Sequence, residues 1–72
     1  MKEGHIRTNT KELRAAQGLK QYELANLADI NKGRLSNIER GIYIPKIEEV
    51  ERISNVLGEK ILFYIEVEPR EG

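Results

Sequence analysis

Hydrophobic positions follow a helical period in most stretches between the glycines of the chain. The clearest repeat advances in steps of three and four residues up to Gly58, and it comprises Ile47, Val50, Ile53, Val56 and Leu57. Such spacing places apolar side chains on one face of a helix. Three shorter stretches have similar spacing and end at glycine or turn residues. The pattern therefore predicts four helices, over residues 10–17, 21–28, 32–40 and 47–57.

The connections between these helices contain residues that are typical of turns. Asp29, Ile30 and Asn31 separate the second helix from the third. Asn31 suits the N-cap of the third helix, because its side-chain oxygen accepts hydrogen bonds from amides of the first turn. Residues 42–45 are predicted to be extended, because Pro45 disfavours helical backbone in the residue before it.

Residues 61–67 have a different composition, in which β-branched, aromatic and aliphatic residues dominate and Glu66 alternates with them. This composition favours a strand over a fifth helix. A lone strand leaves backbone donors and acceptors unpaired, and the rest of the sequence offers no second strand. We therefore expect antiparallel pairing with the same segment of a second copy about a two-fold axis. The expected dimer contacts are Ile61, Phe63, Ile65 and Val67.

Length and composition indicate one small domain. The chain has no cysteine, which excludes disulfides and thiolate zinc sites. Because it has only 72 residues, its core is small, and domains of this size commonly gain stability by dimerisation. We expect a flexible arm at residues 1–8, a helical domain at 9–58, and a dimerisation strand with its tail at 59–72. Because no apolar run is long enough for a membrane span and the first residues lack a secretory signal, we expect a cytoplasmic protein.

The charge is balanced overall but unevenly distributed. The formal net charge is +0, from twelve Lys and Arg and twelve Asp and Glu. Residues 1–46 contain nine of the basic and five of the acidic residues, a net charge of +4, and residues 47–72 have a net charge of −4. A phosphate surface responds mainly to the nearer end of such a molecule. One end is therefore suited to a polyanion, although similar charge runs also occur on solvated helix faces.

Two short helices joined by a three-residue turn with one apolar residue are typical of a helix-turn-helix, here over residues 21–40. The surrounding sequence resembles the Cro, phage-repressor and Xre-type regulators in residues 13–25 and 35–41, and further at Pro45, Ile53, Leu57 and Gly58. This resemblance covers residues 10–58. It implies an all-α, lambda-repressor-like domain that binds double-stranded DNA.

The third predicted helix has an apolar face, with Leu35 and Ile38, and a polar face opposite to it. The major groove accepts one α-helix, and residues near the helix N-terminus can reach base edges. Lysine suits guanine, asparagine can make two hydrogen bonds to adenine, and glycine allows close approach. The predicted base contacts are Lys32, Gly33, Ser36 and Asn37. Taken singly, Lys32, Ser36 and Asn37 fit an ordinary protein surface as well as they fit a base contact.

The resemblance implies further roles around this helix. Gln21 has the position at which the family packs the start of the second helix against the phosphate backbone. Arg14 and Glu39 match a structural ion pair of the family. The expected phosphate contacts, which position a protein without specifying a sequence, are Lys20, Gln21, Arg34, Arg40, Tyr43 and Lys46.

The chain departs from the family pattern at three positions. Lys20 replaces the small N-cap residue before the second helix, which weakens capping by about 1 kcal/mol. Asp29 replaces the glycine that usually opens the turn. Gly33 has no side chain for base recognition and lowers helix stability by roughly 0.5–1 kcal/mol relative to alanine.

Catalytic chemistry is not indicated. His5 is the only histidine and lies in the expected arm without a positioned partner, and Asp29, the only aspartate, lies in the turn. The glutamates after residue 47 fall mostly on the polar face of the fourth helix, and no glycine-rich phosphate loop is present. We therefore expect no enzyme activity, no cofactor and no metal.

Three functions remain open on the sequence. The first is a sequence-specific regulator, acting as a homodimeric repressor on a palindromic operator. The second is the antitoxin of a toxin-antitoxin pair, similar to the strand-tailed partners of HipA-type kinases, which binds both DNA and a toxin protein. The third is a protein-binding module without DNA affinity, which the zero net charge and Gly33 favour slightly.

Overall fold

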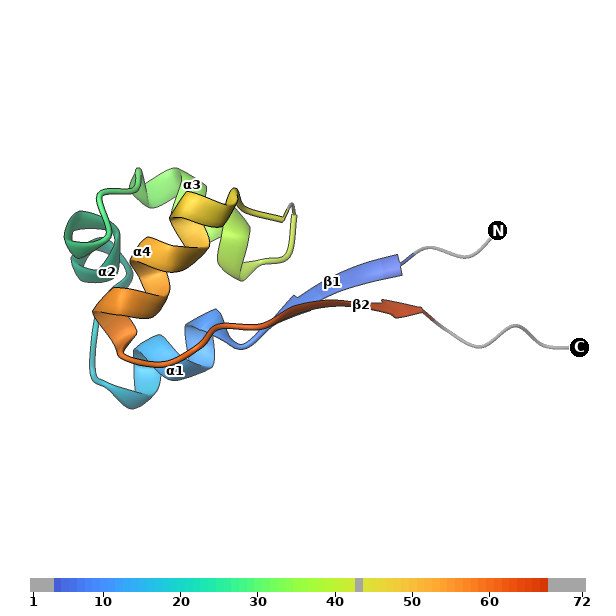
Figure 1. The fold of residues 1–72 in the computed structure, drawn as a ribbon, viewed down its shortest axis with the longest axis horizontal. Coiled ribbons are helices and arrows are strands. Elements are labelled where there is room, and N and C mark those ends of the chain that lie inside the picture. The colour runs from blue at the N-terminus through green and yellow to red at the C-terminus, as the bar shows by residue number, and fades with distance from the viewer. Residues whose placement is uncertain (1–3, 43, 68–72) are drawn as a thin grey trace, which may run out of the picture.

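The computed structural model describes residues 4–42 and 44–67 of the chain. Four helices and two strands follow one another in the order β1, α1, α2, α3, α4, β2 (Figure 1). The four predicted helices are confirmed, each to within two residues at its ends. Their bounds are α1 Thr10–Ala16, α2 Gln21–Leu27, α3 Lys32–Glu39 and α4 Ile47–Leu57.

The core lies between the helices and is built from the apolar faces that the periodicity predicts. Leu24 of α2, Leu35 and Ile38 of α3, and Ile53 of α4 have no exposed surface. Burial of each such side chain contributes about 1.5–3 kcal/mol relative to exposure. Helices α2, α3 and α4 all contribute to this cluster, and α3 packs against α2.

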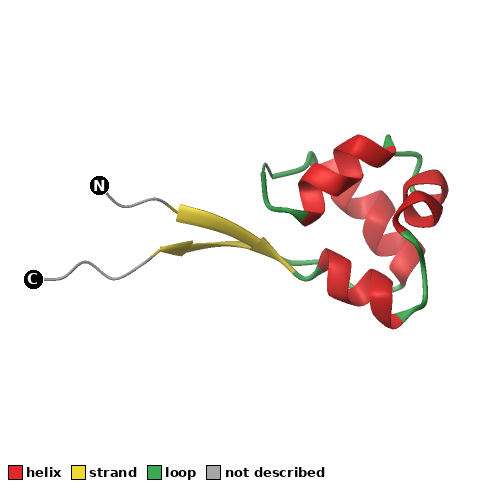
Figure 2. Ribbon diagram, turned by 180° about the vertical axis from the view of Figure 1, so that it is seen from behind, coloured by secondary structure: helices red, strands yellow, loops and turns green. Residues whose placement is uncertain are grey.

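The two strands form an antiparallel ribbon within one chain, so the expectation of a loose arm at residues 1–8 is wrong for residues 4–8. Strand β1 (Gly4–Thr8) pairs with β2 (Phe63–Val67), with Ile6 opposite Ile65. Only one apolar side chain interrupts the polar sequence of β1, so its strand conformation depends on the backbone of β2. Figure 2 shows the ribbon extending away from the four packed helices.

This pairing also corrects the expectation that β2 has no strand partner in its own chain. The strand itself is confirmed, although it begins at Phe63, two residues later than predicted. Ile61 is only 4% exposed and belongs to the helical core, so it is unsuited to the dimer contact expected of it. Phe63 packs partly against the same core, whereas Ile65 is 59% exposed. Pairing with a second copy stays a prediction.

The base of the ribbon is attached to the helices at several points. The Leu62 amide donates to the Asn9 side-chain oxygen at 2.9 Å, and the hydroxyls of Thr8 and Thr10 lie 2.7 Å apart. Gly41, just after α3, lies so close to β1 that a Cβ there would be 2.1 Å from the carbonyl oxygen of Ile6. Its φ of +75° is also unfavourable for other residues. The end of α3 and strand β1 are therefore in direct backbone contact.

Candidate nucleic-acid interface

The turn before α3 and the first turn of α3 have the geometry of a helix-turn-helix. The Asn31 side-chain oxygen accepts hydrogen bonds from the amides of Gly33 and Arg34 at 2.8 and 3.3 Å, as predicted for an N-cap. Asp29 has a φ of 57° and lies in the left-handed region. This conformation explains why a glycine suits the position, because left-handed backbone is costly for residues with a Cβ. Ile30 is buried and anchors the turn to the core.

The outer face of α3 carries all four predicted base contacts. Leu35 and Ile38 are fully buried on the inner face, as expected. Lys32 and Gly33 are exposed at the N-terminal end of the helix. Ser36 and Asn37 lie one turn further along and are half-buried. The helix therefore presents a continuous polar surface that starts at its N-terminus, the arrangement that a major groove accepts.

A buried hydrogen-bond network joins α1, the start of α2 and the end of α3. Arg14 donates to both carboxylate oxygens of Glu39, at 2.7 and 3.1 Å, and also to the Leu19 carbonyl at 2.8 Å. The Gln21 amide nitrogen donates to Glu39 at 3.0 Å. The side chains of Arg14 and Glu39 are only 12% and 2% exposed. The expected ion pair is therefore present in the geometry, and it holds Gln21 at the predicted phosphate-contacting end of α2.

A second ion pair joins α3 to α4. Arg34 donates from Nε and Nη2 to the two oxygens of Glu49, the second at 2.9 Å, and the Lys46 amide donates to Glu49 at 2.8 Å. The hydrogen bond from Arg34 lowers the pKa of Glu49, against the opposing effect of burial, and the Lys46 amide lowers it further. Arg34, an expected phosphate contact, is thus engaged with a buried carboxylate and is only partly exposed.

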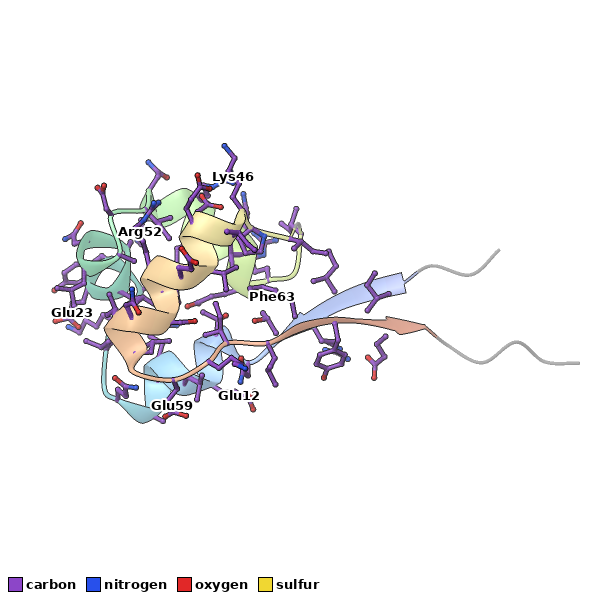
Figure 3. The ribbon with its side chains drawn as sticks, in the orientation of Figure 1. Glu12, Glu23, Lys46, Arg52, Glu59 and Phe63 are labelled. Atoms are coloured by element: carbon purple, nitrogen blue, oxygen red, sulfur yellow. The ribbon has the colours of Figure 1, made fainter. Side chains whose placement is uncertain are left out.

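The other expected phosphate contacts lie at the margins of the outer face of α3. Lys20 precedes α2, Arg40 follows α3, and both are exposed. Lys46 is exposed at the start of α4 and projects from the body of the molecule in Figure 3. Tyr43 lies outside the described residues. Cationic side chains therefore come from two connections, α1–α2 and α3–α4, around one polar helix face.

Sequence reasoning missed several polar contacts that hold these helices together. Glu49 is 7% exposed although its neighbours suggested a solvated helix face. Arg52 of α4 donates to the Ala28 carbonyl at the end of α2 at 2.8 Å, and Gln17 donates to the Leu57 carbonyl at 2.6 Å. The capping pattern Lys46-Ile47-Glu48-Glu49 was the one local signal for Glu49, because a glutamate three residues after an N-cap commonly accepts its amide.

Among residues 4–42 and 44–67, no group of three or more His, Asp or Glu could hold a metal ion. No helix in this part of the chain has the length and apolar character needed to cross a membrane.

Comparison with known families gives a match to the helix-turn-helix family over residues 11–63, which includes all four helices except the first residue of α1. A comparison with curated proteins finds no match. Proteins of this family are DNA-binding regulators of transcription and the family is not one of enzymes. The family match covers most of the chain, and it agrees with the geometry of α2, the turn and α3 and with the Arg14–Glu39 pair. The protein therefore belongs to the Cro and phage-repressor (Xre-type) family of helix-turn-helix transcription regulators.

Proposed function

We propose that the protein is a sequence-specific repressor that binds a palindromic operator as a homodimer. The observation that carries this proposal is the outer face of α3, which is polar along its length and rigidly supported from the other side. The Arg14–Glu39 and Arg34–Glu49 pairs hold the two ends of α3 to α1 and α4. A helix held in this way can enter a major groove without losing its orientation.

Base recognition is assigned to the outer face of α3, from Lys32 to Asn37. Lys32 is suited to guanine and Asn37 to adenine, while Ser36 is permissive and Gly33 lets the backbone approach the bases. Phosphate contacts by Lys20, Gln21, Arg40 and Lys46 would fix the register of the helix in the groove. Arg34 contributes through Glu49 more than through a phosphate, because the carboxylate already accepts two of its hydrogen bonds.

Dimerisation is supported by the ribbon. An isolated two-stranded ribbon is marginally stable in water, and among the described residues no further strand lies beside either outer edge of this one. Large apolar side chains are exposed on the ribbon and on the neighbouring α3–α4 connection, at Ile42, Ile44, Leu62, Tyr64 and Ile65. A second copy that adds its own β2 to the edge of this ribbon would cover part of this surface and pair with the backbone of that edge, with Ile65 as the central apolar contact.

The test is selection of bound duplexes from a random pool, followed by sedimentation of the protein alone and with the selected duplex. The proposal predicts enrichment of an inverted repeat whose half-sites are centred about one helical turn, roughly 34 Å, apart. It also predicts a dimer in both samples. Asn37→Ala should lower the preference at one base pair by about 1–3 kcal/mol, whereas Lys46→Ala should weaken all sequences alike. Enrichment of no sequence would contradict the proposal.

An antitoxin role is the second candidate, and the same exposed apolar residues favour it. They are concentrated at one end of the molecule, around the ribbon, and a partner protein could cover them in place of a second copy. Sedimentation does not separate the two functions, because an antitoxin of this type also binds DNA as a dimer. The neighbouring gene does: a kinase or nuclease toxin encoded beside this chain would support the antitoxin, whereas a divergent promoter would support the repressor.

A further inference from the structure

A hollow at the edge of the outer face of α3 lies between α1, α2 and α3. It is lined by Lys11, Arg14, Gln21, Ser36, Glu39 and Arg40. Its lining includes Ser36, one of the predicted base contacts, so the hollow is continuous with the outer face of α3. The residue pattern of the sequence indicates no role for Lys11, which reaches this place only because α1 packs beside the end of α3.

The inner part of the hollow is electrically neutral and already hydrogen-bonded. Arg14 and Glu39 pair with each other through two hydrogen bonds, and Gln21 donates to the same carboxylate. Glu39 is the one acidic residue of the lining, and its side chain is 2% exposed. The charge of this carboxylate is therefore compensated by its partners, and it does not repel an anion at the mouth of the hollow.

The rim carries two further positive charges. Lys11 and Arg40 are both exposed, and within the described part of the chain neither side chain makes a hydrogen bond or an ion pair. Lys11 and Arg14 are three residues apart and share one face of α1. Glu12, the acidic neighbour of Lys11, lies about 100° round the helix and points away from α3 in Figure 3. Two cations at one rim repel each other, and a shared anion would remove this repulsion.

We infer that Lys11 and Arg40 bind one phosphate of duplex DNA at this hollow. This inference rests on the proposed function and adds Lys11 as a contact from α1. The phosphate would lie beside Ser36, at the edge of the groove that α3 enters. Lys46 does not line the hollow, so it would contact a different phosphate. Arg40 supplies a planar donor group and Lys11 a mobile point charge, a combination that suits the oxygens of a phosphodiester.

The test measures the binding of a fluorescent duplex by the full-length chain between 50 and 200 mM salt. Lys11→Ala should lower the affinity for all sequences and reduce the slope of log affinity against log salt by about 1. Lys60→Ala is the matched control, because Lys60 is also exposed and lines a different hollow with Glu51 and Glu59. It should leave the slope unchanged. Lys11→Arg should retain the slope of the wild type.

A second measurement tests the sharing of one phosphate. In the double variant Lys11→Ala with Arg40→Ala, the loss of binding free energy should differ from the sum of the two single losses, because groups that contact one ligand atom are coupled. Additive losses, with a slope reduced by about 2, would overturn the shared site.

The remaining outcomes are distinct. An unchanged slope in folded Lys11→Ala, with strongly salt-dependent binding by the wild type, would overturn the inference and leave the proposed function intact. Wild-type binding without salt dependence would overturn the proposed function and the inference together. Thermal unfolding of Lys11→Ala at the wild-type temperature confirms that the change in slope is not a folding defect, as expected for an exposed side chain.

Discussion

Replacement of Arg14 by alanine removes the centre of the buried network that joins α1, α2 and α3. The variant loses both hydrogen bonds to Glu39 and the bond to the Leu19 carbonyl. The Glu39 side chain, which is 2% exposed, then keeps the hydrogen bond donated by the Gln21 amide nitrogen at 3.0 Å. A buried charge without a counter-charge is strongly destabilising, because it has lost its hydration without compensation.

The magnitude follows from the burial of the pair. Removal of one partner of a buried ion pair costs about 3–5 kcal/mol. The 12% exposure of Arg14 places this pair at the lower end, about 3 kcal/mol. Small domains have total stabilities of about 5–15 kcal/mol, and a chain of this length lies towards the low end. A loss of about 3 kcal/mol corresponds to a fall of at least about 12 °C in Tm.

The assay is thermal and urea unfolding followed by circular dichroism, with Arg7→Ala as the matched control. Arg7 also pairs with a glutamate, Glu66, but the two side chains are 59% and 54% exposed, so its removal should leave Tm nearly unchanged. Replacement of both Arg14 and Glu39 by methionine should recover most of the loss, because it leaves no unpaired charge. An Arg14→Ala variant as stable as Arg7→Ala would refute this account of the network.

Three further predictions concern stability. The lowered pKa of Glu49 means that its contribution is fully present above the unfolded pKa of a glutamate, about 4.3, and is lost as pH falls through the lower folded value; urea unfolding from pH 7 to about pH 2 should show a larger decline for the wild type than for Glu49→Gln. Gly41→Ala should release β1 from the helices, because the new Cβ would lie 2.1 Å from a carbonyl oxygen of that strand. Gly18→Ala is the control: its φ is similar but the space is open, so it should lower the free energy of unfolding by only about 1–2 kcal/mol. Amide exchange of β1 and β2 distinguishes the two variants, and equal protection of the strands in both would count against the contact. Asp29→Gly should stabilise the domain by about 0.5–1 kcal/mol, since φ there is 57°; an unchanged urea midpoint would show that the aspartate is not strained.

The sequence predicted the features that depend on neighbouring residues. Helix α4 has five apolar residues at steps of three and four, and Asn31 caps α3 through amides two and three residues away. Such signals are local, so they survive without knowledge of the fold. The buried face of α3 could be predicted in the same way, because Leu35 and Ile38 are one turn apart.

The missed features depend on residues that are distant in the sequence. Strand β1 has little apolar character of its own, and its partner is 59 residues away, as the Arg7–Glu66 hydrogen bond shows. Likewise, Arg34 and Glu49 meet because α3 packs against α4, over a separation of 15 residues. Only the tertiary arrangement brings Lys11 to the hollow beside α3. The interface was therefore predictable along one helix but not across helices.

The proposal that α3 presents its outer face to DNA is tested most directly by NMR of the labelled protein as a selected duplex is added. The account predicts the largest amide shifts from Lys32 to Asn37, with smaller changes at the cationic margins around Lys11 and Lys46. Residues on the other hollow, such as Ser54 and Asn55 of α4, should be unaffected. Shifts concentrated on that side of α4, with α3 unchanged, would contradict the account.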